Sequence, residues 1–165
     1  MIIVISGIPG VGKSTIAKRL AEIINAEVID ILEFSLKNKL YQEFDEILNT
    51  YIVDENRLFD ELKKHIENIK DKDIIIEGNF AHLFPDGDLY FVIKADPNIV
   101  YKRLEERGYT YNKIFENIWA MNLEVIEDEL EYLRKEYYIF YNNKEEDLPE
   151  IINKMVDIIK KKKNK

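Results

Sequence analysis

A glycine-rich segment near the start of the chain carries the clearest chemical signal. Residues 7–14 read GIPGVGKS, which matches the pattern G-x-x-x-x-G-K-[S/T] at every fixed position. Glycines in such a loop let several backbone N–H groups approach one polyphosphate, because no side chain stands in the way. The spacing assigns Lys13 to the β and γ phosphates of a nucleotide and Ser14 to a Mg²⁺ ion. The segment therefore predicts ATP binding.

An acidic side chain follows a hydrophobic run further along the chain. Residues 74–76 are isoleucines and Glu77 comes next, where a bound Mg²⁺ would find a second anchor on a neighbouring strand. We assign Glu77 to the metal, through a water molecule, although taken alone it would equally fit an ordinary exposed strand end. If water attacks ATP, a polar side chain must orient it, and Glu77, Asn79 and His82 are the candidates. For His82, a plain loop histidine is an equal alternative.

Two of the five arginines lie four residues apart, at Arg103 and Arg107. On a helix this spacing places both on one face, and Gly108 and Tyr109 follow where the chain must turn. Such a pair beside a glycine hinge is suited to clamp a transferring phosphate. We expect a lid over about residues 107–117, and the alternative is ion pairing within the helix.

Alternating strands and helices are predicted to hold these residues in place. Apolar β-branched runs predict strands at 2–6, 27–29, 74–76, 90–93 and 137–141. Helical spacing predicts helices at about 14–24, 55–69, 97–106, 111–135 and 148–162. Near-continuous apolar strands separated by helices are typical of an α/β fold with a five-stranded parallel sheet covered by helices on both faces. We expect one P-loop NTPase domain over residues 1–165.

Two side-chain patterns are assigned to structure and not to chemistry. The stripe that contains Trp119 lies at helical spacing, and we interpret it as core; its other members are Ile114, Phe115, Ile118, Leu123 and Ile126. His65 lies among charged residues and is expected to be solvated.

The amino-acid composition excludes several kinds of protein and of site. The absence of Cys excludes disulfides and cysteine nucleophiles and, with no recognisable targeting segment, favours a cytoplasmic protein. A net charge of -8 argues against broad contact with nucleic acid or anionic lipid. The last residues, 160–165, contain five lysines. We interpret this basic tail as a solvated helix end, with contact to RNA as the alternative.

Several further segments, together with the phosphate loop, resemble one known family. They are residues 54–57 and 60–62, Phe84 with Pro85, residues 101–105 and 107–109, and Asn143 with Lys144. Over nearly its whole length the chain resembles the adenylate kinase isoenzyme six family, P-loop proteins linked in archaea and eukaryotes to maturation of the small ribosomal subunit. The resemblance implies a nucleoside monophosphate kinase-like fold.

The resemblance also implies site residues and a partner. ATP contacts are implied at Gly10, Gly12, Lys13, Ser14, Thr15, Arg103, Arg107, Asn143 and Lys144. A monophosphate-binding insert is implied over about residues 30–53, with Asp30, Glu33 and Arg57 as candidate contacts. The implied partners are the eleventh small-subunit ribosomal protein and the small ribosomal subunit before it is mature.

Two positions depart from the family pattern. The eukaryotic members carry D-x-H where this chain has Glu77-Gly78-Asn79, so a histidine discussed for ATP hydrolysis is replaced. Leu36 stands where an arginine would hold the acceptor phosphate, which puts tight AMP binding in doubt; Lys37, Lys39 or Arg57 are the candidates to compensate.

Three functions remain open from the sequence. The first is a nucleoside monophosphate kinase, with AMP as the favoured acceptor, that uses Lys13, Arg107 and Mg²⁺ held by Ser14 and Glu77 for charge neutralisation. The second is an ATPase that acts in ribosome biogenesis and 16S rRNA processing through a ribosomal-protein partner, with kinase turnover secondary. The third is a kinase of another small metabolite on the same fold.

Overall fold

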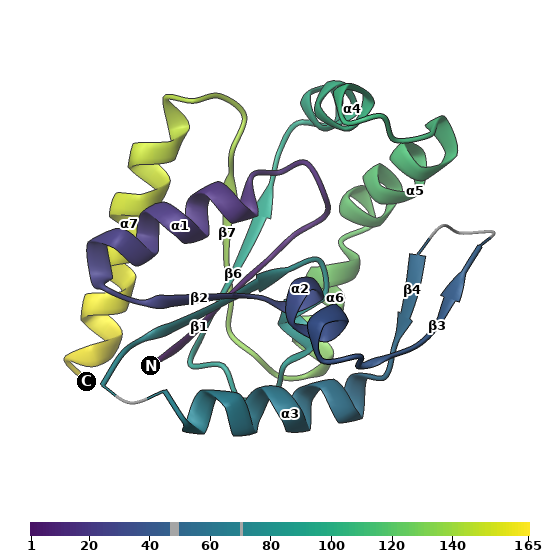
Figure 1. The fold of residues 1–165 in the computed structure, drawn as a ribbon. Coiled ribbons are helices and arrows are strands. Elements are labelled where there is room, and N and C mark those ends of the chain that lie inside the picture. The colour runs from purple at the N-terminus through teal and green to yellow at the C-terminus, as the bar shows by residue number, and fades with distance from the viewer. Residues whose placement is uncertain (47–49, 70) are drawn as a thin grey trace.

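The computed structural model describes residues 1–46, 50–69 and 71–165. A parallel five-stranded sheet in the order β2-β5-β1-β6-β7 forms its centre (Figure 1). The strands are β1 (Ile2–Ser6), β2 (Glu27–Asp30), β5 (Ile74–Gly78), β6 (Leu89–Lys94) and β7 (Tyr138–Tyr141). Every residue of β5 and β6 is buried, as expected for strands that are covered on both faces. The predicted fold class is confirmed.

Helices cover both faces of this sheet. One face packs against α1 (Lys13–Ile24), α4 (Pro97–Glu106), α5 (Tyr111–Asn122) and α7 (Asp147–Lys163). The other packs against α2 (Ile31–Lys37), α3 (Glu55–Glu67) and α6 (Val125–Tyr132). Figure 1 shows this division, with α1 and α7 on one side and α3 on the other. Two hydrophobic clusters, one on each face, thus hold the strand ends in fixed positions.

The predicted insert has a structure of its own. After α2 the chain forms an antiparallel hairpin of β3 (Tyr41–Asp45) and β4 (Thr50–Val53), which projects from the body in Figure 1. Asp30 caps α2, because its Oδ1 accepts a hydrogen bond from the backbone N–H of Glu33 at 3.0 Å. Residues 47–49 of the expected insert lie outside the described residues.

The single helix predicted at 111–135 is wrong. The chain forms two helices there, because Glu124 takes a left-handed backbone conformation, with φ at 57°, between α5 and α6. The interpretation of Trp119 as core is also wrong, since 64% of its surface is exposed. Of the other members of that predicted stripe, Ile114 and Ile118 are buried as expected, whereas Phe115 and Leu123 are exposed.

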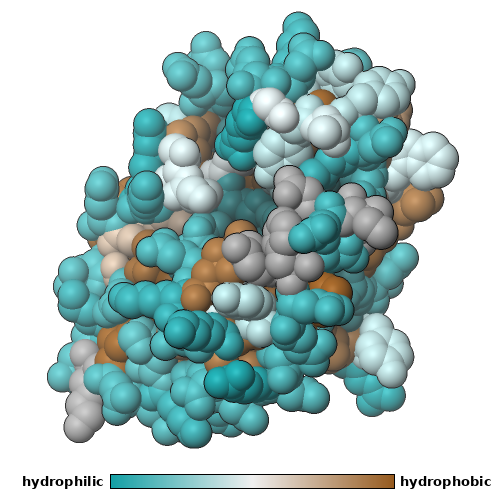
Figure 2. Space-filling model, turned by 45° about the vertical axis from the view of Figure 1, so that its right-hand side comes forward, coloured by the Kyte–Doolittle hydropathy of each residue, from teal (hydrophilic) through white to brown (hydrophobic). Residues whose placement is uncertain are grey.

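The surface is mostly polar. Figure 2 shows a largely hydrophilic face on which hydrophobic residues form small, separate patches. His65 is exposed, as expected. In the part of the chain that the structure describes, no helix is long and apolar enough to cross a bilayer. The lysines at 160–163 form the last turn of α7, where positive charge stabilises the helix terminus.

Candidate nucleotide-binding site

The glycine-rich loop joins the carboxyl end of β1 to the first turn of α1. Gly10 and Gly12 have φ values of 89° and 91°, a conformation that favours glycine. A Cβ atom on Gly12 would lie 2.4 Å from Nδ2 of Asn142, so a side chain there would also clash. The loop therefore curls tightly around the N-terminus of α1, whose free N–H groups and dipole favour an anion.

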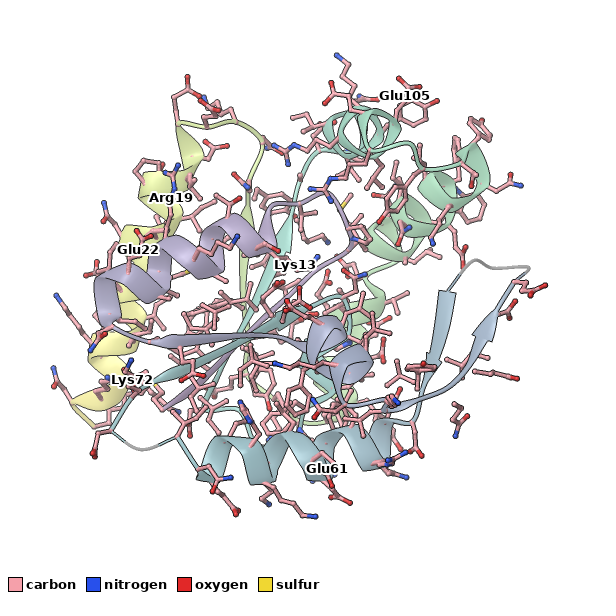
Figure 3. The ribbon with its side chains drawn as sticks, in the orientation of Figure 1. Lys13, Arg19, Glu22, Glu61, Lys72 and Glu105 are labelled. Carbon is pink, nitrogen blue, oxygen red and sulfur yellow. The ribbon has the colours of Figure 1, made fainter. Side chains whose placement is uncertain are left out.

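Lys13 is buried beneath this loop, with 7% of its surface exposed. Its Nζ donates a hydrogen bond to the carbonyl oxygen of Ile8 at 2.9 Å, and Figure 3 shows the side chain near the centre of the molecule. Burial lowers the pKa of Lys13 to about 8, against an opposing effect of the Glu77 carboxylate. An added phosphate would favour the charged lysine.

Ser14 and Glu77 meet across the pocket. The Ser14 hydroxyl donates a hydrogen bond to Oε1 of Glu77 at 3.0 Å. Burial raises the pKa of Glu77, and the nearby Asp30 carboxylate adds to the effect, whereas the Ser14 bond and Lys13 oppose it. A hydroxyl and a carboxylate are the hard oxygen ligands that Mg²⁺ prefers, so this pair fits the ion. No cluster of three or more His, Asp or Glu that could hold a metal occurs within the described ranges, so phosphate and water would complete the shell.

These residues line one cavity of about 590 Å³, which the insert partly borders. Its wall on the loop side holds Lys13, Ser14, Thr15, Glu77, Asn79 and Arg107. Its wall on the insert side holds Asp30, Leu32, Ile52, Val53 and Glu55. Among the described lining residues the cations are Lys13 and Arg107, so positive charge is concentrated on the loop side.

A second cavity of about 410 Å³ adjoins the first along the loop. Gly10, Gly12, Thr15 and Arg107 line both, and Lys144 lines the second together with Arg19, Arg103 and Asn142. A nucleotide with its phosphates at Lys13 would thus have a second hollow beside it, on the side where β7 ends. Lys144, for which the resemblance implies a contact near the base, is a lining residue of this second cavity.

Arg103 ties the loop to the end of β7. Its Nη1 donates to the carbonyl oxygens of Gly10 and Asn142, both at 3.1 Å, and its Nη2 donates to that of Asn143 at 3.5 Å. Asn143 in turn accepts a hydrogen bond from the backbone N–H of Asp96 at 2.6 Å. The side chains of Arg103 and Asn143 therefore hold the walls of the site together. Arg107 is different: it is the exposed C-cap residue of α4, and it lines both cavities.

The residues proposed for the acceptor or for positioning water lie partly outside the main cavity, and His82, Glu33 and Arg57 do not line it. His82 is buried against Ser6, whose Oγ lies 2.7 Å from its Nδ1, while its Nε2 lies 3.5 Å from Oε1 of Glu129. Glu33 and Arg57 each use their backbone N–H groups to complete a helix cap, and both are exposed. Asn79 does line the cavity. Of Asn79 and His82, the two candidates besides Glu77 for positioning a water molecule, only Asn79 therefore borders the site.

Asn142 is a site residue that sequence reasoning missed. Its Nδ2 donates to the carbonyl oxygen of Val11 at 2.9 Å, so the side chain braces the loop from beneath. No periodicity or motif singles it out. The one usable signal is its place directly after a predicted strand, because the carboxyl ends of parallel strands converge on the ligand site of such sheets.

Comparison with known proteins finds a family model and relatives that cover most of this chain. Residues 3–130 match a protein-family model described as an AAA domain. A protein of Methanocaldococcus jannaschii named "Putative adenylate kinase" is 40% identical over 167 residues, which cover 100% of this chain and 89% of that protein. A protein of the same name from Saccharolobus solfataricus is 34% identical and covers 95% of this chain and 82% of its own length.

Solved structures of low identity share the fold. Shikimate kinase from Acinetobacter baumannii, in complex with shikimate, superposes with a TM-score of 0.66 at 17% identity and covers 99% of this chain and 95% of that one. Shikimate kinase from Bacteroides thetaiotaomicron gives 0.59 at 16% identity, with 97% and 98% covered. These likenesses support the fold alone.

Proposed function

The chain belongs to the adenylate-kinase-like family of P-loop proteins, and on this basis we propose that it transfers the γ-phosphate of ATP to a nucleoside monophosphate, with AMP as the acceptor. The observation that carries the proposal is the convergence of Lys13, Ser14, Glu77 and Arg107 on one cavity. Two cations, a hydroxyl and a carboxylate at the N-terminus of α1 form a site for a polyphosphate and its metal.

Each of these residues has a defined task in the proposed reaction. Lys13 and Arg107 neutralise charge on the phosphates, and the loop N–H groups hold them in place. Ser14 and Glu77 would hold Mg²⁺, which neutralises charge on the phosphate oxygens when it is bound. The acceptor oxygen of a monophosphate is already anionic, so no general base is needed and the protein contributes mainly positioning. Closure of the segment after Arg107 over the cavity would exclude water.

A second candidate function is ATP hydrolysis coupled to ribosome assembly, and one observation favours it. The insert side of the cavity offers Asp30, Glu55 and three aliphatic side chains but, among the described residues, no cation for an acceptor phosphate. An acceptor without charge, such as water, is not repelled there. Asn79 or Glu77 would then orient the water. The acidic chain also suits a basic partner such as the eleventh small-subunit ribosomal protein.

ATP turnover in the presence of Mg²⁺ and AMP tests the proposal. We expect AMP to be consumed with ATP, and Lys13→Gln to slow turnover by roughly 100-fold or more, because it removes a charge that contacts the transferring phosphate. Lys18→Gln is the matched control, since Lys18 is an exposed lysine on the same helix. Turnover that is unchanged in Lys13→Gln would show that the reaction takes place elsewhere.

Leu36→Arg separates the two candidates. If a monophosphate is the natural acceptor, an arginine at this position supplies a missing counter-charge and should lower the KM for AMP several-fold. If hydrolysis is the main reaction, the release of free phosphate should not respond to this substitution. A rate of free-phosphate release that exceeds AMP consumption in both proteins would favour the second candidate.

A further inference from the structure

A basic cavity lies at the edge of the sheet opposite the glycine-rich loop. It encloses about 550 Å³ and is bordered by the amino ends of β6 and β7 and by the last turns of α7. Figure 1 shows the end of α7 beside the N-terminus, and in Figure 3 Lys72 marks the same end of the molecule. The six residues of β6 span roughly 20 Å between this end of the sheet and the end that carries the glycine-rich loop.

Five cations line this cavity from two walls. Arg134 and Lys135 come from the segment between α6 and β7, and Lys161, Lys162 and Lys165 come from the end of α7. In the described part of the chain none of the five forms an ion pair. Their charges are therefore available to a ligand.

The two carboxylates of the lining offset only part of this charge. Asp88 accepts a hydrogen bond from the backbone N–H of Ile2 at 2.7 Å, so it is engaged with the strand below, and Glu136 is exposed. Five cations against two carboxylates leave a local excess of three positive charges. The whole chain carries -8, so the cavity stands out against an acidic surface.

Aromatic rings shape the same cavity. The ammonium of Lys135 lies 5.7 Å from the ring centre of Tyr90, whose hydroxyl is fixed by donating to Phe84 and accepting from Gly87. This contact positions Lys135 without neutralising it. Tyr138 packs on Phe91 and keeps 41% of its surface exposed at the rim. Cations beside an accessible ring are the combination that binds the backbone and bases of a single strand.

From this arrangement we infer that the cavity between α7 and the α6–β7 segment binds the phosphate groups of a single-stranded nucleic acid, with a base against Tyr138. A strand fits better than a free polyphosphate because the cations come from separate walls and the partly exposed ring of Tyr138 lies beside them. The lysines of the tail would thus contact the strand, and this binding is independent of the proposed phosphoryl transfer.

The experiment measures binding of a fluorescein-labelled oligouridylate, ten nucleotides long, to the full chain by fluorescence anisotropy. We expect affinity to fall steeply between about 50 mM and about 200 mM salt, because bound cations release counterions from the strand. The double variant K161Q/K162Q should raise the Kd about tenfold or more and flatten the salt dependence.

A matched variant separates this site from general charge. K154Q/K160Q removes two lysines from the same helix, and neither residue lines the cavity, so its Kd should stay within about twofold of the wild type. An equal loss in both double variants would overturn the inference, as would no binding at low salt with about 100 µM protein. Both pairs are solvent-exposed, and unchanged ATP turnover would verify that the variants are folded.

Competitors and an aromatic variant identify the ligand. Tyr138→Leu should weaken the oligonucleotide about fivefold or more while leaving inorganic tripolyphosphate unaffected, because only a base can stack on the ring. Displacement of the oligonucleotide by ATP at concentrations that just fill the nucleotide site would mean that it binds there, and the inference would be wrong. Displacement by tripolyphosphate at equal phosphate concentration would reject a strand as the ligand.

Discussion

Burial lowers the pKa of two side chains in the region of the glycine-rich loop. Lys13 lies beneath the loop with a pKa lowered to about 8, and His82 lies behind Ser6 with a pKa lowered to about 4. In both cases the loss of hydration is the largest cause. Lys13 reaches a cavity, so its charge can be restored by a ligand, whereas His82 contacts only protein atoms.

The lowered pKa of Lys13 predicts that the affinity for ATP depends on pH. Above about pH 8 the free protein loses the lysine proton, and the proton must be regained when the phosphates bind. The affinity should therefore fall roughly tenfold between about pH 7 and about pH 9, as measured by isothermal titration calorimetry. Lys13→Gln should bind weakly with a flat profile. A wild-type affinity that is constant over this range would contradict the assignment.

The lowered pKa of His82 predicts that the stability of the folded protein depends on pH. The unfolded chain takes up the histidine proton near its ordinary pKa of 6.5, whereas the folded protein takes it up only near 4. Between these values the unfolded state binds more protons, so stability is lost as the pH falls from about 6.5 to about 4, by roughly 2–3 kcal/mol.

Urea unfolding at a series of pH values checks this prediction. The difference between wild type and His82→Gln should shrink as the solution is acidified, because the variant lacks the group that titrates. His65→Gln is the control, since His65 is exposed and its replacement leaves the buried surroundings of His82 intact. Identical pH profiles for the two variants would count against a buried, neutral His82.

At the scale of elements, a buried ion pair fixes α6 to the sheet. Nζ of Lys94, on β6, lies 2.8 Å from Oε2 of Glu127, on α6, and both side chains are almost fully buried. Removing one partner leaves a charge without compensation, which costs more than the pair contributes. The pair thus joins α6 to the sheet just after the helix is interrupted at Glu124.

Glu127→Gln is therefore expected to lower the free energy of unfolding by about 3–5 kcal/mol, as measured by chemical denaturation. The double variant Lys94→Met with Glu127→Leu should recover most of this loss, because no charge remains buried. Glu150→Gln, which removes the exposed partner of Lys154, should change stability by about 0.5 kcal/mol or less. A loss for Glu127→Gln as small as that of the control would mean that the pair is solvated.

The same elements show what could be predicted from sequence. The strands, the glycine-rich loop and α4 have local signals: β-branched runs, a spaced motif and a proline in the first helical turn. The break between α5 and α6 has none, because Glu124 takes a left-handed conformation that is usual for glycine. Trp119 was misassigned because helical spacing gives a stripe but does not say which stripe faces the core.

At the scale of the whole molecule, the parallel sheet brings together side chains that are far apart in the chain. Arg103, Asn142 and the loop at Gly10 meet because β1, β6 and β7 are adjacent and end at one edge. Lys13, Ser14 and Glu77 could be expected from a motif and a strand end, but the bracing by Asn142 depends on strand order. The absence of Arg57 from the cavity wall likewise depends on how α3 packs.

The fate of the γ-phosphate tests the central proposal most directly. The protein is incubated with Mg²⁺, AMP and ATP labelled at the γ position, and the labelled products are separated over time. Transfer to AMP predicts that the label appears in ADP, that little free phosphate forms, and that Lys13→Gln abolishes the signal. Label that accumulates in free phosphate at the same rate with and without AMP would contradict the proposed kinase.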